Sequence, residues 1–367
     1  MSDNTKIEWA DATVNAVNGC SVLSPGCTNC YAMRLAGTRL REHPSRAGLT
    51  QPSKAGPVWT GEVRLNEQQL LQPLRWRRPR RIFWNAHGDL FHDAVPDEWI
   101  DRVFAICALT PQHTHMILTK RPARMRRYMA GFDDQLGGPI EGLRGALVEG
   151  TAQSIWHDRT GDDTVDEWLA VHLPLPNVWL GASIEDQQRA DERIPDLLAT
   201  PAAKRFISAE PLLGPIDLTS VRRFPGRADK EFVDALGGNC WTNQSGLPNP
   251  DPSWAKPGMP FSDGGRGLDW LIVGGESGLG ARPMHPDWAR SLCDQCEAAG
   301  VAFFFKQWGE WKPFAGWHDG VSAYSDASGT YSSDRIKKLD DKHYAARVGK
   351  RAAGRLLDGR EHSEFPA

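Results

Sequence analysis

No segment of this 367-residue chain approaches the ~18–20 consecutive apolar residues that a membrane-spanning helix needs. The first residues, Met1 to Lys6, also lack the apolar core of a secretory signal. Seven cysteines without an export signal favour a reducing compartment, where thiols act as metal ligands or core residues. We therefore expect a cytoplasmic protein that does not contact a membrane.

Strong net charge is absent as well, because 46 acidic residues nearly balance 43 lysines and arginines and leave a formal charge of −3. This balance gives no overall attraction for nucleic acid, so any nucleic-acid site must come from a local basic patch. The chain is long enough to bury a large core, as one large α/β domain or two smaller ones.

A dinucleotide-binding fingerprint is also incomplete. Gly278 and Gly280 follow an apolar segment, but the pattern Gly-x-Gly-x-x-Gly is not finished, which argues against a Rossmann domain. Short apolar segments do recur, each leading into polar residues and most into a potential helix, at 14–18, 81–85, 115–119, 178–183, 204–209, 269–274 and 301–306. Such alternation favours a parallel sheet, and six to seven units fit an α/β fold of the partial (β/α) barrel type.

Two stretches interrupt this alternation. Residues 130–176 and 214–268 carry many glycines, prolines and charges, so we expect inserted loop regions or lids there. Residues 317–367 are expected to form a C-terminal extension of the single domain, 1–367.

The most informative feature is a group of three cysteines, Cys20, Cys27 and Cys30, directly after the first predicted strand. An odd number cannot pair completely as disulfides, and the next cysteine, Cys107, is far away in the sequence. Three thiolates on a four-iron cluster would leave one iron open to a ligand. The alternative is structural zinc with a histidine as fourth ligand, His87 or His92.

Polar side chains follow nearly every predicted strand. In a parallel barrel these positions face one mouth, where barrel enzymes have their active sites. They are Cys20, Cys27, Cys30, His87, Asp89, His92, Thr119, Lys120, Arg121, Ser183, Glu185, Ser208, Glu210, Gly274, Gly275, Glu276, Ser277, Lys306 and Gln307.

A resemblance to known proteins rests on several of these segments together. They are Ile7-Glu8-Trp9, the loop 19–32, Asp89-Leu90-Phe91-His92, Leu118-Thr119-Lys120-Arg121, the segment 208–212, the segment 273–278 and the segment 305–309. With them the chain resembles the radical S-adenosylmethionine (SAM) superfamily, and more narrowly a phage- and bacteria-associated family with a three-cysteine motif. The cysteine spacing departs from the commonest superfamily pattern: six residues separate the first two cysteines, and Asn29 stands where an aromatic residue usually precedes the last.

The resemblance implies a [4Fe-4S] cluster held by Cys20, Cys27 and Cys30, with SAM bound at the open iron. An external one-electron reductant of flavodoxin or ferredoxin type would then allow formation of a 5′-deoxyadenosyl radical. The residues that the resemblance suggests for cofactor binding are Tyr31, Lys120, Ser183, Glu185, Ser208, Glu210, Gly274, Gly275 and Glu276. The catalytic candidates are Asp89, Lys120, Glu276 and Lys306.

The substrate expected from the sequence is a nucleic acid or nucleotide base, to be modified or repaired. Arg121 and Arg124 follow a strand and so begin at the mouth, where they would hold phosphates, and His87 and His92 would contact the substrate.

Three other functions remain open at this point. They are radical modification of a peptide or protein, a zinc-stabilised nucleic-acid-binding protein without catalysis, and a metal-dependent hydrolase that uses His87, Asp89 and His92. Cys293 and Cys296 either belong to the core or join Cys240 at a second cluster.

Overall fold

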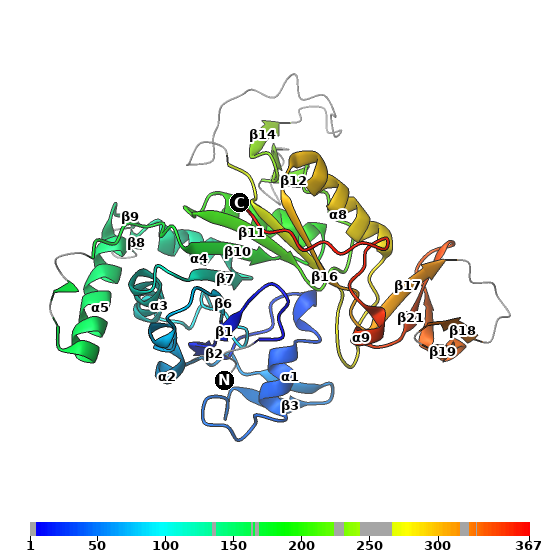
Figure 1. The fold of residues 1–367 in the computed structure, drawn as a ribbon, viewed down its shortest axis with the longest axis horizontal. Coiled ribbons are helices and arrows are strands. Elements are labelled where there is room, and N and C mark those ends of the chain that lie inside the picture. The colour runs from blue at the N-terminus through cyan, green and yellow to red at the C-terminus, as the bar shows by residue number, and fades with distance from the viewer. Residues whose placement is uncertain are drawn as a thin grey trace.

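The centre of the protein is a seven-stranded parallel sheet, curled into a half-barrel (Figure 1). The structure is a computed structural model, and it describes residues 5–133, 137–162, 164–165, 169–223, 231–242, 266–315, 323–327 and 329–367. The strands follow one another in chain order: β1 (Ala12–Val14), β6 (Arg81–Trp84), β7 (Thr114–Thr119), β10 (Val178–Ser183), β11 (Lys204–Ala209), β15 (Trp270–Gly274) and β16 (Ala302–Gln307). Every neighbouring pair is parallel, which confirms the predicted partial (β/α) barrel.

The first predicted strand, 14–18, is wrong in its bounds. β1 ends at Val14, and Val17–Asn18 form a separate strand, β2, which pairs with β5 (Arg64–Leu65) outside the main sheet. The backbone N–H of Val17 donates to Asn85 Oδ1 at 2.8 Å, so a side chain takes over the donor that a continuing strand would have paired.

Helices cover the outer face of the sheet (Figure 1). They are α3 (Asp97–Leu109), α4 (Pro122–Met129), α7 (Gln187–Leu198) and α8 (Pro286–Ala299), and a further helix, α5 (Leu143–Thr160), packs on α3. Side chains alternate along the strands, so that Ile82 and Trp84 belong to the cluster under the helices, whereas Phe83 belongs to the cluster on the inner face. This alternation gives the half-barrel two separate apolar cores.

Aromatic residues fill the inner core. Trp270 lies at its centre, 6.0 Å from Trp9 and 4.9 Å from Phe365 between ring centroids. Trp9 belongs to the N-terminal segment and Phe365 to the C-terminal one, so both ends of the chain close the concave face of the sheet. Three of the 15 tryptophans of the chain, Trp9, Trp179 and Trp270, belong to this inner core.

The cysteine loop leads into a small N-terminal layer. It contains the short helix η1 (Pro25–Cys27), α1 (Tyr31–Gly37) and the hairpin of β3 (Thr50–Ser53) and β4 (Gly56–Trp59). Two further short helices, α2 (Glu67–Leu70) and η2 (Pro73–Arg75), lead back to β6.

The two predicted insertions contain regular structure. Residues 130–176 hold the hairpin of β8 (Phe132–Asp133) and β9 (Gly138–Pro139) and the long helix α5, which packs against α3. Residues 214–268 hold the antiparallel strands β12 (Val221–Arg222), β13 (Glu231–Asp234) and β14 (Asn239–Thr242), and part of this insertion lies outside the described residues. A role for either insertion as a lid stays a prediction.

The C-terminal part forms an antiparallel sheet in the order β17 (Trp311–Ala315), β21 (His343–Arg347) and β20 (Ile336–Lys338). The hairpin β18 (Ala323–Asp326) and β19 (Gly329–Ser332), the turn η4 (Ser333–Arg335) and α9 (Lys350–Ala353) complete it. Within the described residues, no helix combines the length and apolarity needed to cross a membrane.

Candidate functional site

The three N-terminal cysteines meet the strand-end polar residues at one cavity. This cavity, of about 200 Å³, is lined by Cys20, Cys27 and Cys30 together with Lys120 and Ser183. Lys120 directly follows β7, and Ser183 ends β10, so the cavity lies at the carboxyl end of the parallel strands. That is the end at which parallel barrels carry their active sites.

Glu185, just past the end of β10, holds the middle of the cysteine loop. Its Oε1 accepts the backbone N–H of Gly26 at 3.1 Å, and its Oε2 accepts from Arg193 at 2.9 Å. A Cβ on Gly26 would lie 3.1 Å from the Glu185 carboxyl carbon, so glycine permits this close approach. Burial would raise the pKa of Glu185, but the charges of Arg193 and Lys120 outweigh it and lower the pKa. The carboxylate is therefore ionised and fixed by the loop it holds.

The segment after β15 also holds the cysteine loop, and we call such a set of hydrogen bonds to the loop a clasp. The carboxylate of Glu276 accepts from Asn29 Nδ2 at 2.9 Å and from Arg282 Nη2 at 2.6 Å. The same Arg282 nitrogen donates to the carbonyl of Pro25 at 3.0 Å, and Arg34 donates to the carbonyl of Leu279 at 2.9 Å. Glu276, a candidate for catalysis and cofactor binding, thus contacts the cysteine loop itself.

Asp89 and Arg121 make the third contact with the cysteine loop, at Cys20. Asp89 accepts from Thr119 Oγ1 at 2.7 Å, from the backbone N–H of Lys120 at 3.1 Å and from Arg121 Nη1 at 3.1 Å. Arg121 Nη1 lies 3.9 Å from Cys20 Sγ. Burial and the charge of Asp89 raise the pKa of the Cys20 thiol to about 12, so a metal must displace its proton. Asp89 positions Arg121, and Arg121 places a positive charge beside Cys20.

Lys120 and Asp89 are the two charged side chains among the described residues that line the cavity. Its Nζ donates to Ser183 Oγ at 2.6 Å. An ammonium group at this place can bind the carboxylate of a ligand. Two neighbouring strands therefore deliver one cation and one hydroxyl to the same wall.

The four predicted substrate residues have internal partners. Arg124 donates to the carbonyls of His92 and Val95 and to Asp97, at 2.7 to 2.8 Å, so its guanidinium stabilises the loop before α3. Arg121 is bound by Asp89 as described. The structure therefore gives both arginines partners other than a phosphate.

The two histidines lie beside the loop, and among the described residues neither belongs to a set of side chains close enough to share a metal ion. His87 Nδ1 lies 2.7 Å from Arg46 Nη2, and burial together with that charge lowers the pKa of His87 to about 4. His92 Nε2 lies 2.9 Å from Ser21 Oγ. Of these two histidines and Asp89, only Asp89 lines the cavity, which weakens the hydrolase interpretation.

A separate group forms between β11 and β16. Lys306 Nζ donates to Glu210 Oε1 at 2.9 Å, and Gln307 Nε2 lies 3.3 Å from the same oxygen. Ser208 is buried on β11. In the described part of the chain, the lining of the cysteine cavity includes none of the predicted residues Tyr31, Glu185, Ser208, Glu210, Gly274, Gly275, Glu276 and Lys306.

The glycines after β15 approach the chain's own backbone. A Cβ on Gly275 would lie 2.0 Å from the carbonyl oxygen of Trp308, so glycine is required there by packing. A Cβ on Gly274 would lie 3.2 Å from the Glu210 carboxyl carbon. Gly274 and Gly275, predicted to bind a cofactor, thus lie close to other parts of the protein itself.

Asn85 is a site residue that the sequence analysis missed. It directly follows β6 and has a φ of 58°, a left-handed conformation in which asparagine is enriched. It lines the cysteine cavity, and its buried Nδ2 has no hydrogen-bond partner within the protein. The signal was present in the sequence, since a polar residue directly follows the apolar residues Ile82, Phe83 and Trp84.

The spacing of the cysteines tests which metal group they fit. Around one zinc ion, Zn–S bonds of ~2.3 Å hold tetrahedral sulfurs ~3.8 Å apart. Among the described residues, the one set of His, Cys, Asp or Glu with ligand atoms all within 4.8 Å of one another lies elsewhere, beside α8. The three sulfurs are thus spread more widely than one zinc ion requires, and neither His87 nor His92 completes such a set. A four-iron cluster does not require so close an approach, because each thiolate binds a different iron.

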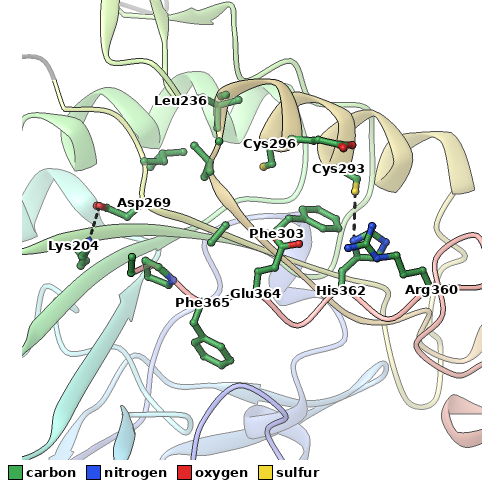
Figure 2. A pocket seen from close by; sticks show the side chains of 18 residues that line it. Lys204, Leu236, Asp269, Cys293, Cys296, Phe303, Arg360, His362, Glu364 and Phe365 are labelled. Carbon is green, nitrogen blue, oxygen red and sulfur yellow. Dashed lines mark hydrogen bonds and ion pairs between the residues drawn. The ribbon is translucent and has the colours of Figure 1, made fainter.

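A larger cavity, of about 690 Å³, lies at the opposite end of the strands (Figure 2). Cys293 and Cys296 face it from α8, and His362 Nδ1 lies 3.7 Å from Cys293 Sγ. Burial raises the pKa of the Cys293 thiol to about 11, so the thiol form is favoured. The side chain of Cys240 lies outside the described residues, so a second cluster stays a prediction.

Comparison with known proteins gives a family match over residues 4–366, to a model described as a protein of unknown function (DUF5131). Neither a curated protein nor a solved structure matches the chain.

Proposed function

Since the chain belongs to the DUF5131 family of unknown function, its own residues must indicate its activity, and we propose that it is a radical SAM enzyme. The observation that carries this proposal is the convergence of Cys20, Cys27 and Cys30 with Lys120 and Ser183 on one cavity at the carboxyl end of a half-barrel. When bound, a [4Fe-4S] cluster with SAM at its open iron supplies one-electron cleavage of the sulfonium and a 5′-deoxyadenosyl radical.

The protein's part begins with fixing the ligand loop. Glu185 holds Gly26, and the pair Glu276–Arg282 holds Asn29 and Pro25, so both gaps between the cysteines are anchored. Rigid placement of the ligands matters because a metal group is tuned by the contacts around its ligands.

Charge in the cavity matches an anionic group. Arg121 Nη1, 3.9 Å from Cys20 Sγ, favours the thiolate that an iron requires. Lys120 Nζ, next to Ser183, is placed to bind the carboxylate of an amino-acid moiety. Trp59, Phe83 and Leu118 line the apolar side and exclude water from the reacting atoms.

The substrate class that we propose is a nucleic acid or nucleotide base. Among the described residues, six large hydrophobic side chains are strongly exposed. Four of them lie on the cysteine loop, at its end or on the segment that clasps it: Val22, Leu23, Tyr31 and Leu279. An exposed aromatic ring with apolar neighbours is a surface on which a base stacks, at ~1–3 kcal/mol per base.

The test is anaerobic reconstitution of the full chain with iron and sulfide, followed by reduction and addition of SAM. We expect about four iron atoms per chain and release of 5′-deoxyadenosine, as one four-iron cluster requires. Both should be lost in Cys27→Ala and kept in Cys293→Ala, a matched control because both cysteines are partly exposed.

The same assay tests the class of substrate. Single-stranded nucleic acid should raise the yield of 5′-deoxyadenosine, whereas stimulation by peptides alone would favour the alternative of protein modification. Zinc that is lost in Cys27→Ala, with no 5′-deoxyadenosine formed, would contradict the proposal and favour a zinc-stabilised binding protein.

A further inference from the structure

Two histidines and two aspartates meet far from the cysteine cavity, where α8 joins the C-terminal antiparallel sheet. His285 and Asp287 come from the start of α8, and Asp340 and His343 come from the turn into β21. One ligand atom from each of the four side chains lies within 4.8 Å of every other. Figure 1 shows the two elements, α8 and β21, near one another although they are distant in sequence.

The distances within this group are close to those of a metal site. Asp340 Oδ2 lies 2.8 Å from His285 Nε2 and 3.0 Å from His343 Nδ1. Around a tetrahedral zinc ion with bonds of ~2.0–2.1 Å, nitrogen and oxygen ligands stand ~3.3 Å apart. The two distances from Asp340 thus lie within about half an ångström of this value.

The two imidazoles are already held in place. Their side chains are 12% and 18% exposed, and their ring centroids lie 4.7 Å apart. The other nitrogen of His285, Nδ1, accepts the backbone N–H of Asp287 at 3.2 Å, and the Asp287 carboxylate lies 3.9 Å from the same nitrogen. This hydrogen bond at the start of α8 holds the His285 ring in place.

The donor types select the metal. Two imidazole nitrogens with carboxylate oxygens suit zinc and its neighbours among the transition metals, whereas Mg²⁺ and Ca²⁺ prefer sites made of oxygen alone. We propose that His285, Asp340 and His343 bind one divalent transition-metal ion of the zinc type, with the Asp287 carboxylate as the fourth side chain of the group.

A metal at this place would fasten the C-terminal sheet to α8. In the described residues, the apolar cluster at this junction has three buried side chains, Ala281, Trp311 and Ala345. So small a core contributes little cohesion, and small units of structure commonly depend on a metal. The proposed role is structural and does not depend on the function proposed for the cysteines.

The test measures zinc binding by the full chain after chelator treatment. Wild type should take up zinc with a rise in Tm, because an ion that binds only the folded state stabilises it by mass action. His343→Ala should lose one zinc per chain and the metal-dependent rise in Tm. Asp287→Asn should weaken zinc binding, because it removes one of the two carboxylates of the group.

Two controls separate this site from other causes. His157→Ala removes an exposed histidine that lies 3.9 Å from Asp158, and it should bind zinc as wild type does. Cys27→Ala removes any zinc held by the cysteines and should keep the zinc that His343→Ala loses. Comparing Tm with and without zinc within each variant separates metal binding from damage to folding. Equal zinc uptake and an equal rise in Tm in wild type and His343→Ala would overturn the proposal.

Discussion

At the scale of single residues, the acidic side chains near the cysteine loop differ in what they do. Asp89 and Glu276 were candidates for catalysis, yet their oxygens are taken up by hydrogen bonds within the protein. Glu185 was expected to hold a cofactor, and it holds Gly26 and Arg193 instead. All three contacts fix the ligand loop or the charge beside it, so these residues are positioning residues in our account.

Glu185→Gln should be strongly destabilising. Arg193 has a side chain only 5% exposed, and the substitution leaves its charge without a counter-charge. Breaking a buried pair from one side costs ~3–5 kcal/mol. Denaturant unfolding measures this loss of stability. The control is Glu192→Gln, on the same helix as Arg193. Glu192 is 39% exposed, so its substitution should cost less than ~0.5 kcal/mol. Equal effects of the two substitutions would show that the buried pair has no special role.

At the scale of elements, the cysteine loop is held by segments that come much later in the chain. Asn29 and Glu276 are 247 residues apart in sequence, and Gly26 and Glu185 are 159 apart. Apolar segments reveal a parallel sheet because buried strands are apolar throughout, and so the seven-stranded half-barrel was predictable. The clasps on the loop were not, because pairing between distant polar residues leaves no local pattern.

Arg282→Gln should release the loop without unfolding the sheet. The substitution removes the ion pair with Glu276 and the hydrogen bond to the carbonyl of Pro25. We expect faster amide hydrogen exchange in residues 20–30 and unchanged exchange in β10 and β11. Arg126→Gln, which breaks an ion pair with Asp196 on the outer surface, serves as control and should leave the loop unchanged. Unchanged exchange in residues 20–30 of Arg282→Gln would contradict the clasp.

At the scale of the whole molecule, stability should fall in mild acid. His115 is fully buried, accepts from Trp84 Nε1 at 3.0 Å, and has its pKa lowered by burial from 6.5 to about 3. The unfolded chain therefore binds a proton at a pH where the folded chain does not. Stability from this group is complete above pH 6.5 and decreases as the pH falls towards 3, by up to ~1.4 kcal/mol per pH unit.

The measurement is Tm as a function of pH for wild type and His115→Gln. The variant should have a lower Tm at neutral pH and a flatter dependence between pH 6.5 and 4, because the proton-binding group is gone. Parallel curves for the two proteins would show that His115 does not contribute to acid sensitivity.

The central claim is that three cysteines hold a cluster whose open iron binds SAM. Electron paramagnetic resonance of the reduced, reconstituted protein tests it most directly, because SAM bound at one iron changes the electronic environment of the whole cluster. We predict the signal of a reduced [4Fe-4S] cluster that changes shape when SAM is added and is missing in Cys27→Ala. A cluster signal that SAM leaves unchanged, or no cluster signal in wild type, would contradict the account.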